Sequence, residues 1–184
     1  MLFRSGSTEL VLVDTAGPVP RILDWNSAPW GVVSLTESES LGASADPLER
    51  INAYARMRSR VTEAFRAFAS RLPDRVGQLR LLGTSGTVTT LASLHLQLPR
   101  YDRQAIDGLI VPSASMRDIS TRLATMSMEE RRLLPCIGTE RADLVVAGCA
   151  ILESILDIWP AERLGVADRG IREGILRGLM DSRQ

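Results

Sequence analysis

Several residue types that build common functional sites are scarce in this sequence. It has no lysine, one histidine and two cysteines among 184 residues. The cysteines, Cys136 and Cys149, form no Cys-x-x-Cys pair and have no histidine beside them, so neither a zinc site nor a disulfide framework is indicated. This usage fits a reducing, cytoplasmic setting. The histidine, His95, lies among leucines at helical spacing without an acidic or nucleophilic partner nearby, which argues against a catalytic base.

The sequence also lacks net charge and long apolar runs. Its 22 basic side chains, all arginines, balance 22 acidic ones, so no broad field can attract a nucleic acid duplex or an anionic membrane. Arginine suits contacts with phosphate, although genomic base composition explains the bias more simply. No apolar run reaches the ~18 to 20 residues that cross a bilayer, and the stretch 10–13 is too short for a signal peptide. We expect one domain, no membrane partner, and only a local anion site.

Short β-rich runs fill the first third of the chain. Turn residues divide it into three runs, which predict an antiparallel meander with strands at 9–14, 21–27 and 32–36. Trp25 and Trp30 flank a turn there, and we expect both to pack beneath the meander. Asp46 is a predicted N-cap, and Pro47 follows it in the first turn of the helix. The long amphipathic helix that begins there is expected to end near Pro73.

The rest of the chain alternates predicted strands and helices. Strands are expected at 78–82, 105–111 and 164–167, and helices at 88–98, from 115 onward, at 131–134, at 141–159 and up to about 180. Ser127 and Glu130 form a predicted capping box. This alternation indicates an α/β layered domain with a mixed sheet, an opening antiparallel meander and covering helices.

The turn after the predicted strand 78–82 is the strongest candidate for a binding site. Gly83, Ser85, Gly86 and Thr87 lie there, directly before a helix. Glycines let backbone N–H groups approach an anion, the helix N-terminus adds a favourable dipole, and the hydroxyls can donate to phosphate oxygens. A purely structural turn, with Thr87 as helix cap, is the alternative.

A second small-residue turn lies at the N-terminus, in the run Ser5-Gly6-Ser7-Thr8-Glu9. Such a turn can wrap a phosphate while the Glu9 carboxylate holds Mg²⁺ or orients water. A frayed terminus with a solvated glutamate is the alternative interpretation.

These two turns and the tail 168–174 resemble the exopolyphosphatase and guanosine pentaphosphate phosphohydrolase family (Ppx/GppA), part of the actin, Hsp70 and sugar kinase superfamily. The resemblance extends from Gly6 to about Met180. Its pieces follow the order of the family, and they are 6–9, 31–37, 83–90, 126–131, 141–148 and 170–174.

The resemblance implies a ribonuclease H-like lobe that acts on polyphosphate or guanosine pentaphosphate with Mg²⁺. It implies phosphate contacts from the two glycine-containing turns and from Arg141, and it makes Glu9 a catalytic and metal-binding residue. The family loop Asp-x-Gly-Gly-Gly-Ser-x-Glu matches only from Gly6 onward, so residues 1–5 look like foreign or damaged sequence. The residues assigned to phosphate are Gly6, Ser7, Gly83, Ser85, Gly86, Thr87 and Arg141.

Family members place a further lobe, which carries a catalytic glutamate, before this point. Residues 6–184 are therefore expected to be the second lobe, inactive alone, a candidate homodimer when intact, and prone to self-association through an uncovered apolar face. The alternatives are a noncatalytic phosphate or nucleotide sensor, a sugar or acyl kinase of the same superfamily, and a purely structural interaction domain.

Overall fold

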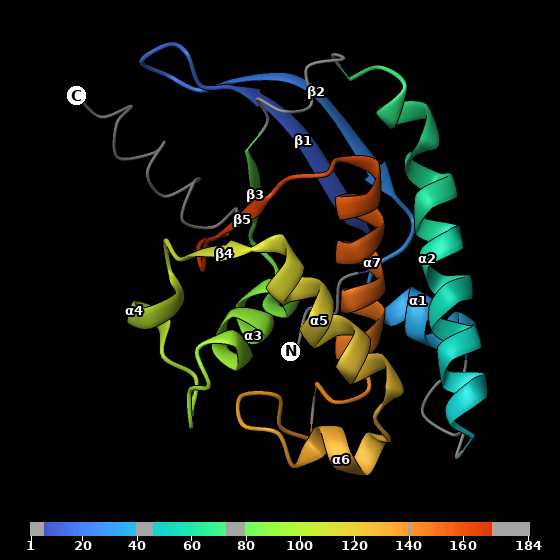
Figure 1. Cartoon of the computed structure of the whole chain (residues 1–184). Coiled ribbons are helices and arrows are strands. Elements are labelled where there is room, and N and C mark those ends of the chain that lie inside the picture. Colours follow the sequence, from blue (N-terminus) through green and yellow to red (C-terminus); the bar gives the residue numbers. More distant parts are fainter. Residues whose placement is uncertain (1–5, 40–45, 73–79, 140, 171–184) are drawn as a thin grey trace.

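The computed structural model of the chain describes residues 6–39, 46–72, 80–139 and 141–170 (Figure 1). Two sheets are present in this part of the chain. The first is an antiparallel hairpin of β1 (Thr8–Asp14) and β2 (Arg21–Ala28). The second has the order β3-β5-β4, in which β5 (Arg163–Val166) pairs in parallel with β3 (Leu81–Gly83) and antiparallel with β4 (Ile110–Pro112).

The helices pack around these sheets, with α7 at the centre of the fold (Figure 1). Every residue of α7 from Val145 to Leu156 is buried, which agrees with the predicted core helix at 141–159. The helices are α1 (Val32–Glu39), α2 (Pro47–Ala69), α3 (Gly86–His95), α4 (Arg103–Ile106), α5 (Ser113–Thr125), α6 (Met128–Arg132) and α7 (Val145–Ile158). No described helix is both long and apolar enough to span a membrane.

Local signals set the beginning of α2 and α6 as predicted. The Asp46 carboxylate accepts a hydrogen bond from the Leu48 N–H at 2.9 Å, and proline occupies the first turn of α2. The capping box of α6 is complete, because Ser127 Oγ accepts from the Glu130 N–H while the Glu130 carboxylate accepts from the Ser127 N–H. These signals act within one turn of helix, so the sequence alone can reveal them.

Two buried arginines bind the carbonyls at the C-terminal end of α5. Arg131, 2% exposed, donates from Nη1 to the carbonyls of Leu123 and Met126. Arg50, 7% exposed, donates from Nε and Nη2 to the Thr125 carbonyl. These are carbonyls that the end of a helix leaves without intrahelical partners. The two guanidiniums therefore attach α2 and α6 to the end of α5.

The predicted third strand at 32–36 is wrong, because these residues form α1. Ser34 Oγ accepts from the Gly31 N–H at the start of the helix, and the Thr36 hydroxyl donates to the Val32 carbonyl one turn back. Leu35 is fully buried, and α1 packs on α7. Burial against α7 outweighs the β propensity of the local sequence, so the meander is a two-stranded hairpin.

The predicted strand at 105–111 is also wrong from 105 to 109, and only residues 110 and 111 belong to β4. Asp102 caps the short helix α4 by accepting from the N–H groups of Gln104 and Ala105. Gly108, with φ of 86°, then turns the chain into β4. The mixed sheet and covering helices are observed as expected, but Trp25 is 61% exposed and does not pack beneath the hairpin, whereas Trp30 is half-buried against the core. The closing helix predicted up to 180 lies outside the described residues.

Candidate functional site

The turn between β3 and α3 has the geometry of a helix start that is open to solvent. Ser85 is the N-cap, and its Oγ accepts from the Val88 N–H at 3.3 Å. Ser85 and Gly86 are exposed. A methyl group on Gly83 would lie 2.7 Å from Val88 Cγ2, so only glycine fits between the strand and the helix. The first N–H groups of α3 have no intrahelical acceptor and, with the helix dipole, favour an anion here.

Thr87 contributes to this turn differently from what the sequence suggested. A methyl group on Gly148 of α7 would lie 2.0 Å from Thr87 Oγ1. The Thr87 side chain therefore occupies the space that the missing side chain of Gly148 leaves, and its hydroxyl is directed at α7. Its backbone N–H stays in the first turn of α3, where an anion can accept it.

The structure brings Arg141 to this same turn. A methyl group on Gly86 would lie 3.7 Å from Arg141 Nη1, and Nη1 donates to Thr90 Oγ1 at 3.4 Å. The arginine is exposed, and more than 50 residues separate it from the turn in sequence. Arg141 therefore adds a guanidinium beside the N-terminus of α3, which is the arrangement expected of a phosphate site.

The residues at the start of β1 form a separate small cluster with the end of β2. Glu9 Oε1 accepts from Ser7 Oγ at 3.0 Å and from Ser27 Oγ at 2.6 Å, and the Gly6 carbonyl accepts from Ser34 Oγ at 3.2 Å. Figure 1 shows β1 beginning, and β3 ending, at the lower ends of the two sheets. The two predicted turns thus face the same end of the sheets.

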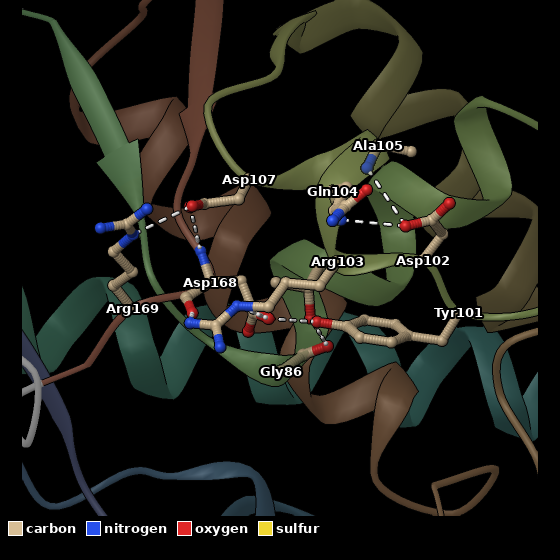
Figure 2. A network of polar contacts seen from close by, with 10 residues as sticks. Gly86, Tyr101, Asp102, Arg103, Gln104, Ala105, Asp107, Asp168 and Arg169 are labelled. Carbon is tan, nitrogen blue, oxygen red and sulfur yellow. Dashed lines mark hydrogen bonds and ion pairs between the residues drawn. The ribbon is translucent and has the colours of Figure 1, made fainter.

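A charged network that the sequence reasoning left out of the site lies beyond the end of β5 (Figure 2). The Asp168 carboxylate accepts from the Tyr101 hydroxyl at 2.5 Å and pairs with Arg103 Nε at 3.1 Å. Asp107 accepts from the Asp168 N–H and from Arg169 Nε, both at 3.0 Å. Because β3 and β5 are parallel neighbours, residues that follow both strands meet at one edge of the sheet.

The contacts of this network shift the pKa values of Tyr101 and Asp107. Burial, and then the hydrogen bond to Asp168, raise the pKa of Tyr101 to about 12, while Arg103 and Arg141 oppose that rise. The hydrogen bond from the Asp168 N–H, followed by that from Arg169, lowers the pKa of Asp107. Figure 2 shows Gly86 of the α3 turn beside the residues of this network. The signal in the sequence was a run of charged residues directly after a strand.

The predicted Mg²⁺ ligand fits only a metal that is held mainly by substrate. No group of three or more histidine, cysteine, aspartate or glutamate side chains that could hold a metal ion occurs among the described residues. Glu9 supplies one carboxylate, of which Oε1 already accepts two hydroxyls. Mg²⁺ often takes one or two protein carboxylates together with substrate phosphates and waters. Glu9 can act in this way, but it is not part of a protein cage.

Comparison with known proteins identifies relatives along almost the whole chain. The family model described as "Ppx/GppA phosphatase family" matches residues 5–183. Exopolyphosphatase 2 of Mycobacterium tuberculosis is 28% identical over 179 residues, which cover 95% of this chain and 53% of the relative. The chain therefore spans about half the length of the curated relatives that it matches.

Solved structures support the same relationship. A crystal structure of the Ppx/GppA family member of Aquifex aeolicus matches with a TM-score of 0.77 and 25% identity, over 98% of this chain and 55% of that one. An exopolyphosphatase from Cytophaga hutchinsonii matches with a TM-score of 0.79 over 96% of this chain and 55% of that one, and at 21% identity it supports the fold alone. The mixed α/β fold is thus one that solved Ppx/GppA proteins share.

Proposed function

This chain belongs to the Ppx/GppA phosphatase family, and we propose that it forms the ribonuclease H-like second lobe of an enzyme that hydrolyses terminal phosphoanhydride bonds. The substrate class is inorganic polyphosphate or guanosine pentaphosphate. The observation that carries the proposal is the exposed N-terminus of α3 with the Arg141 guanidinium beside Gly86. Oriented N–H groups and a guanidinium are the groups that stabilise a transferring phosphoryl group.

Each predicted site residue has a role that its position allows. The turn of Gly83, Ser85, Gly86 and Thr87 receives the terminal phosphate on backbone N–H groups, and Arg141 donates to its oxygens. At the start of β1, Gly6 and Ser7 lead to Glu9, whose carboxylate orients the attacking water. Bound Mg²⁺ would neutralise phosphate charge next to this carboxylate.

Phosphoryl transfer needs groups on both sides of the reacting phosphate. The chain supplies one set, and we propose that a preceding lobe supplies the other, together with a second carboxylate. We therefore expect this chain alone to bind short phosphates but to release phosphate from polyphosphate far more slowly than ~1 s⁻¹. A turnover number above that value with Mg²⁺ would contradict the two-lobe proposal.

The binding proposal is tested with tripolyphosphate by isothermal titration calorimetry. Replacing Arg141 with glutamine removes a charged hydrogen-bond donor, which is worth about 1.5 kcal/mol or more and so about a tenfold loss of affinity. Arg122, an exposed residue in the last turn of α5, provides the matched control, and Arg122→Gln should change affinity less than about twofold. Equal affinity of the Arg141 variant and the unchanged chain would remove Arg141 from the site.

A further inference from the structure

The Glu9 carboxylate is hydrogen-bonded to a serine of the neighbouring strand. Glu9 of β1 and Ser27 of β2 are partners in the register of the hairpin, so their side chains lie on the same face of the sheet. Ser27 Oγ donates to Glu9 Oε1 at 2.6 Å. Both residues are exposed, and an exposed glutamate can change rotamer readily. The hydroxyl of Ser27 therefore restricts a carboxylate that would otherwise move.

The hydroxyls around Glu9 occupy only one of its two carboxylate oxygens. Ser7 Oγ donates to the same Oε1 at 3.0 Å, whereas Oε2 accepts no hydrogen bond from the residues that the structure describes. An ionised carboxylate has about four lone-pair positions, so Oε2 retains its capacity to bind a metal ion or a water. The two serines thus hold the carboxylate by one oxygen and leave the other for ligands.

Only one of the two serines can keep its bond to Glu9 when phosphate is bound. A hydroxyl carries a single proton, and Ser7 is one of the residues assigned to phosphate. A Ser7 hydroxyl that donates to a phosphate oxygen no longer donates to Glu9. Ser27 belongs to β2 instead, and strand pairing fixes its position. Ser27 is therefore the donor that stays with Glu9 in the bound state.

The strand ends that carry Glu9 and Ser27 are anchored to the rest of the fold. Beside them, Thr8 pairs with Ala28, which is 1% exposed. The Thr8 hydroxyl also donates to the Trp30 carbonyl at 2.7 Å. These contacts limit the movement of one strand against the other, so the backbone itself keeps the serine opposite the carboxylate.

We propose that Ser27 is a positioning residue, which holds the Glu9 carboxylate in the orientation that receives the metal ion and the attacking water. This inference rests on the role that the proposed function gives to Glu9. Groups that hydrogen-bond a metal-binding side chain fix its orientation, and their loss commonly lowers metal affinity. Ser27 acts only through Glu9.

The test measures how much Mg²⁺ strengthens the binding of tripolyphosphate to the full chain. Isothermal titration calorimetry with Mg²⁺ and with EDTA gives two dissociation constants, and their ratio is the Mg²⁺-dependent gain. Ser27→Val and Ser27→Thr introduce side chains of almost the same shape, both suited to a strand, but only threonine keeps a hydroxyl. We expect Ser27→Val to reduce the gain by about three- to tenfold. Ser27→Thr should restore it to within about twofold of the unchanged chain.

Two control variants separate this effect from a general one. Ser70 is an exposed serine at the end of α2 whose hydroxyl donates to the Ala67 carbonyl, so Ser70→Ala should leave the gain within about twofold. Glu9→Gln should remove most of the gain, because it removes the charge that attracts the metal ion. Melting temperatures of all variants show whether each is folded at the temperature of the titration.

The outcomes distinguish this inference from the proposed function on which it rests. A gain that Glu9→Gln removes and Ser27→Val leaves intact overturns the inference alone. Equal losses with valine and threonine also overturn it, because the hydroxyl then has no role. A gain that Glu9→Gln leaves intact, or the absence of any gain in the unchanged chain, overturns both the inference and the role assigned to Glu9.

Discussion

Replacing Gly148 with alanine tests the contact that holds the α3 turn against α7. An alanine methyl group there would lie 2.0 Å from Thr87 Oγ1, 2.7 Å from Thr87 Cγ2 and 2.8 Å from Thr87 Cβ. Ordinary van der Waals separation requires a relative displacement of about 1 Å or more. Gly148 is the fourth residue of α7 and is buried, and both helices pack in the core. The strain therefore cannot be relieved by rotating a side chain into solvent.

Overpacking of this kind costs about 1 to 3 kcal/mol in the free energy of unfolding. For a chain of this size, each kcal/mol lowers the melting temperature by about 2 to 4 °C. Urea unfolding followed by circular dichroism should show a lower midpoint with an unchanged slope. Tripolyphosphate affinity should fall as well, because the displaced turn carries the N–H groups assigned to phosphate.

Thr87→Ala provides the compensating change, because it removes the two shortest contacts and leaves only the one at 2.8 Å. The double variant should be more stable than the sum of the single effects predicts, by about 1 kcal/mol. Gly17→Ala is the matched control, since a methyl group there makes an ordinary contact at 3.8 Å to the Val19 carbonyl. A Gly148→Ala protein that unfolds at the same urea concentration as the unchanged chain would refute the packing argument.

Four further predictions concern other parts of the molecule. Arg131→Ala should destabilise the fold by roughly 2 to 5 kcal/mol in urea unfolding, because it removes the donor to one buried and one partly buried carbonyl. The pKa of Tyr101 is raised to about 12. The contribution of the protonated tyrosine to the free energy of unfolding is therefore complete below pH ~10 and is lost as the pH rises through about 12. Asp168→Asn should move the tyrosinate absorbance titration of Tyr101 to lower pH. Trp25→Ser with Val13→Thr, at positions 61% and 40% exposed, should reduce concentration-dependent self-association in sedimentation velocity.

The parts of the fold that the sequence predicted depend on interactions within one turn of chain. The Asp46 cap, the Ser127–Glu130 box and the strand, turn and helix around Gly83 each combine a few adjacent residues whose chemistry is the same in any fold. The predicted strand at 32–36 fails for the opposite reason, because its structure depends on distant residues. Its run of valine, serine, leucine and threonine suits a strand locally, but the free energy gained by burying Leu35 in the core makes it helical.

Some residues of the candidate site could likewise be predicted from local sequence, and others are brought there only by tertiary packing. The turn of Gly83 and Gly86 could be found from its residues, whereas the position of Arg141 beside Gly86 depends on how α3 packs against α7, and the resemblance to the family supplied it. The network of Asp168 and Tyr101 was missed because it joins a loop before α4 to the end of β5. No local pattern relates two residues that are 67 positions apart.

The charges around the α3 turn limit the anion that this part of the chain can hold. Arg103 and Arg169 face Asp168 and Asp107, so their positive charges are balanced nearby. Arg141 donates instead to a neutral hydroxyl, and it is the guanidinium best placed to meet a phosphate. The positive charge of one guanidinium, together with a helix dipole equivalent to about half a charge, balances the negative charge of a single phosphoryl group. Each added phosphoryl group brings further negative charge, so a polyphosphate requires more cations than these. This imbalance is the physical reason for including Mg²⁺, and groups from a second lobe, in the proposed reaction.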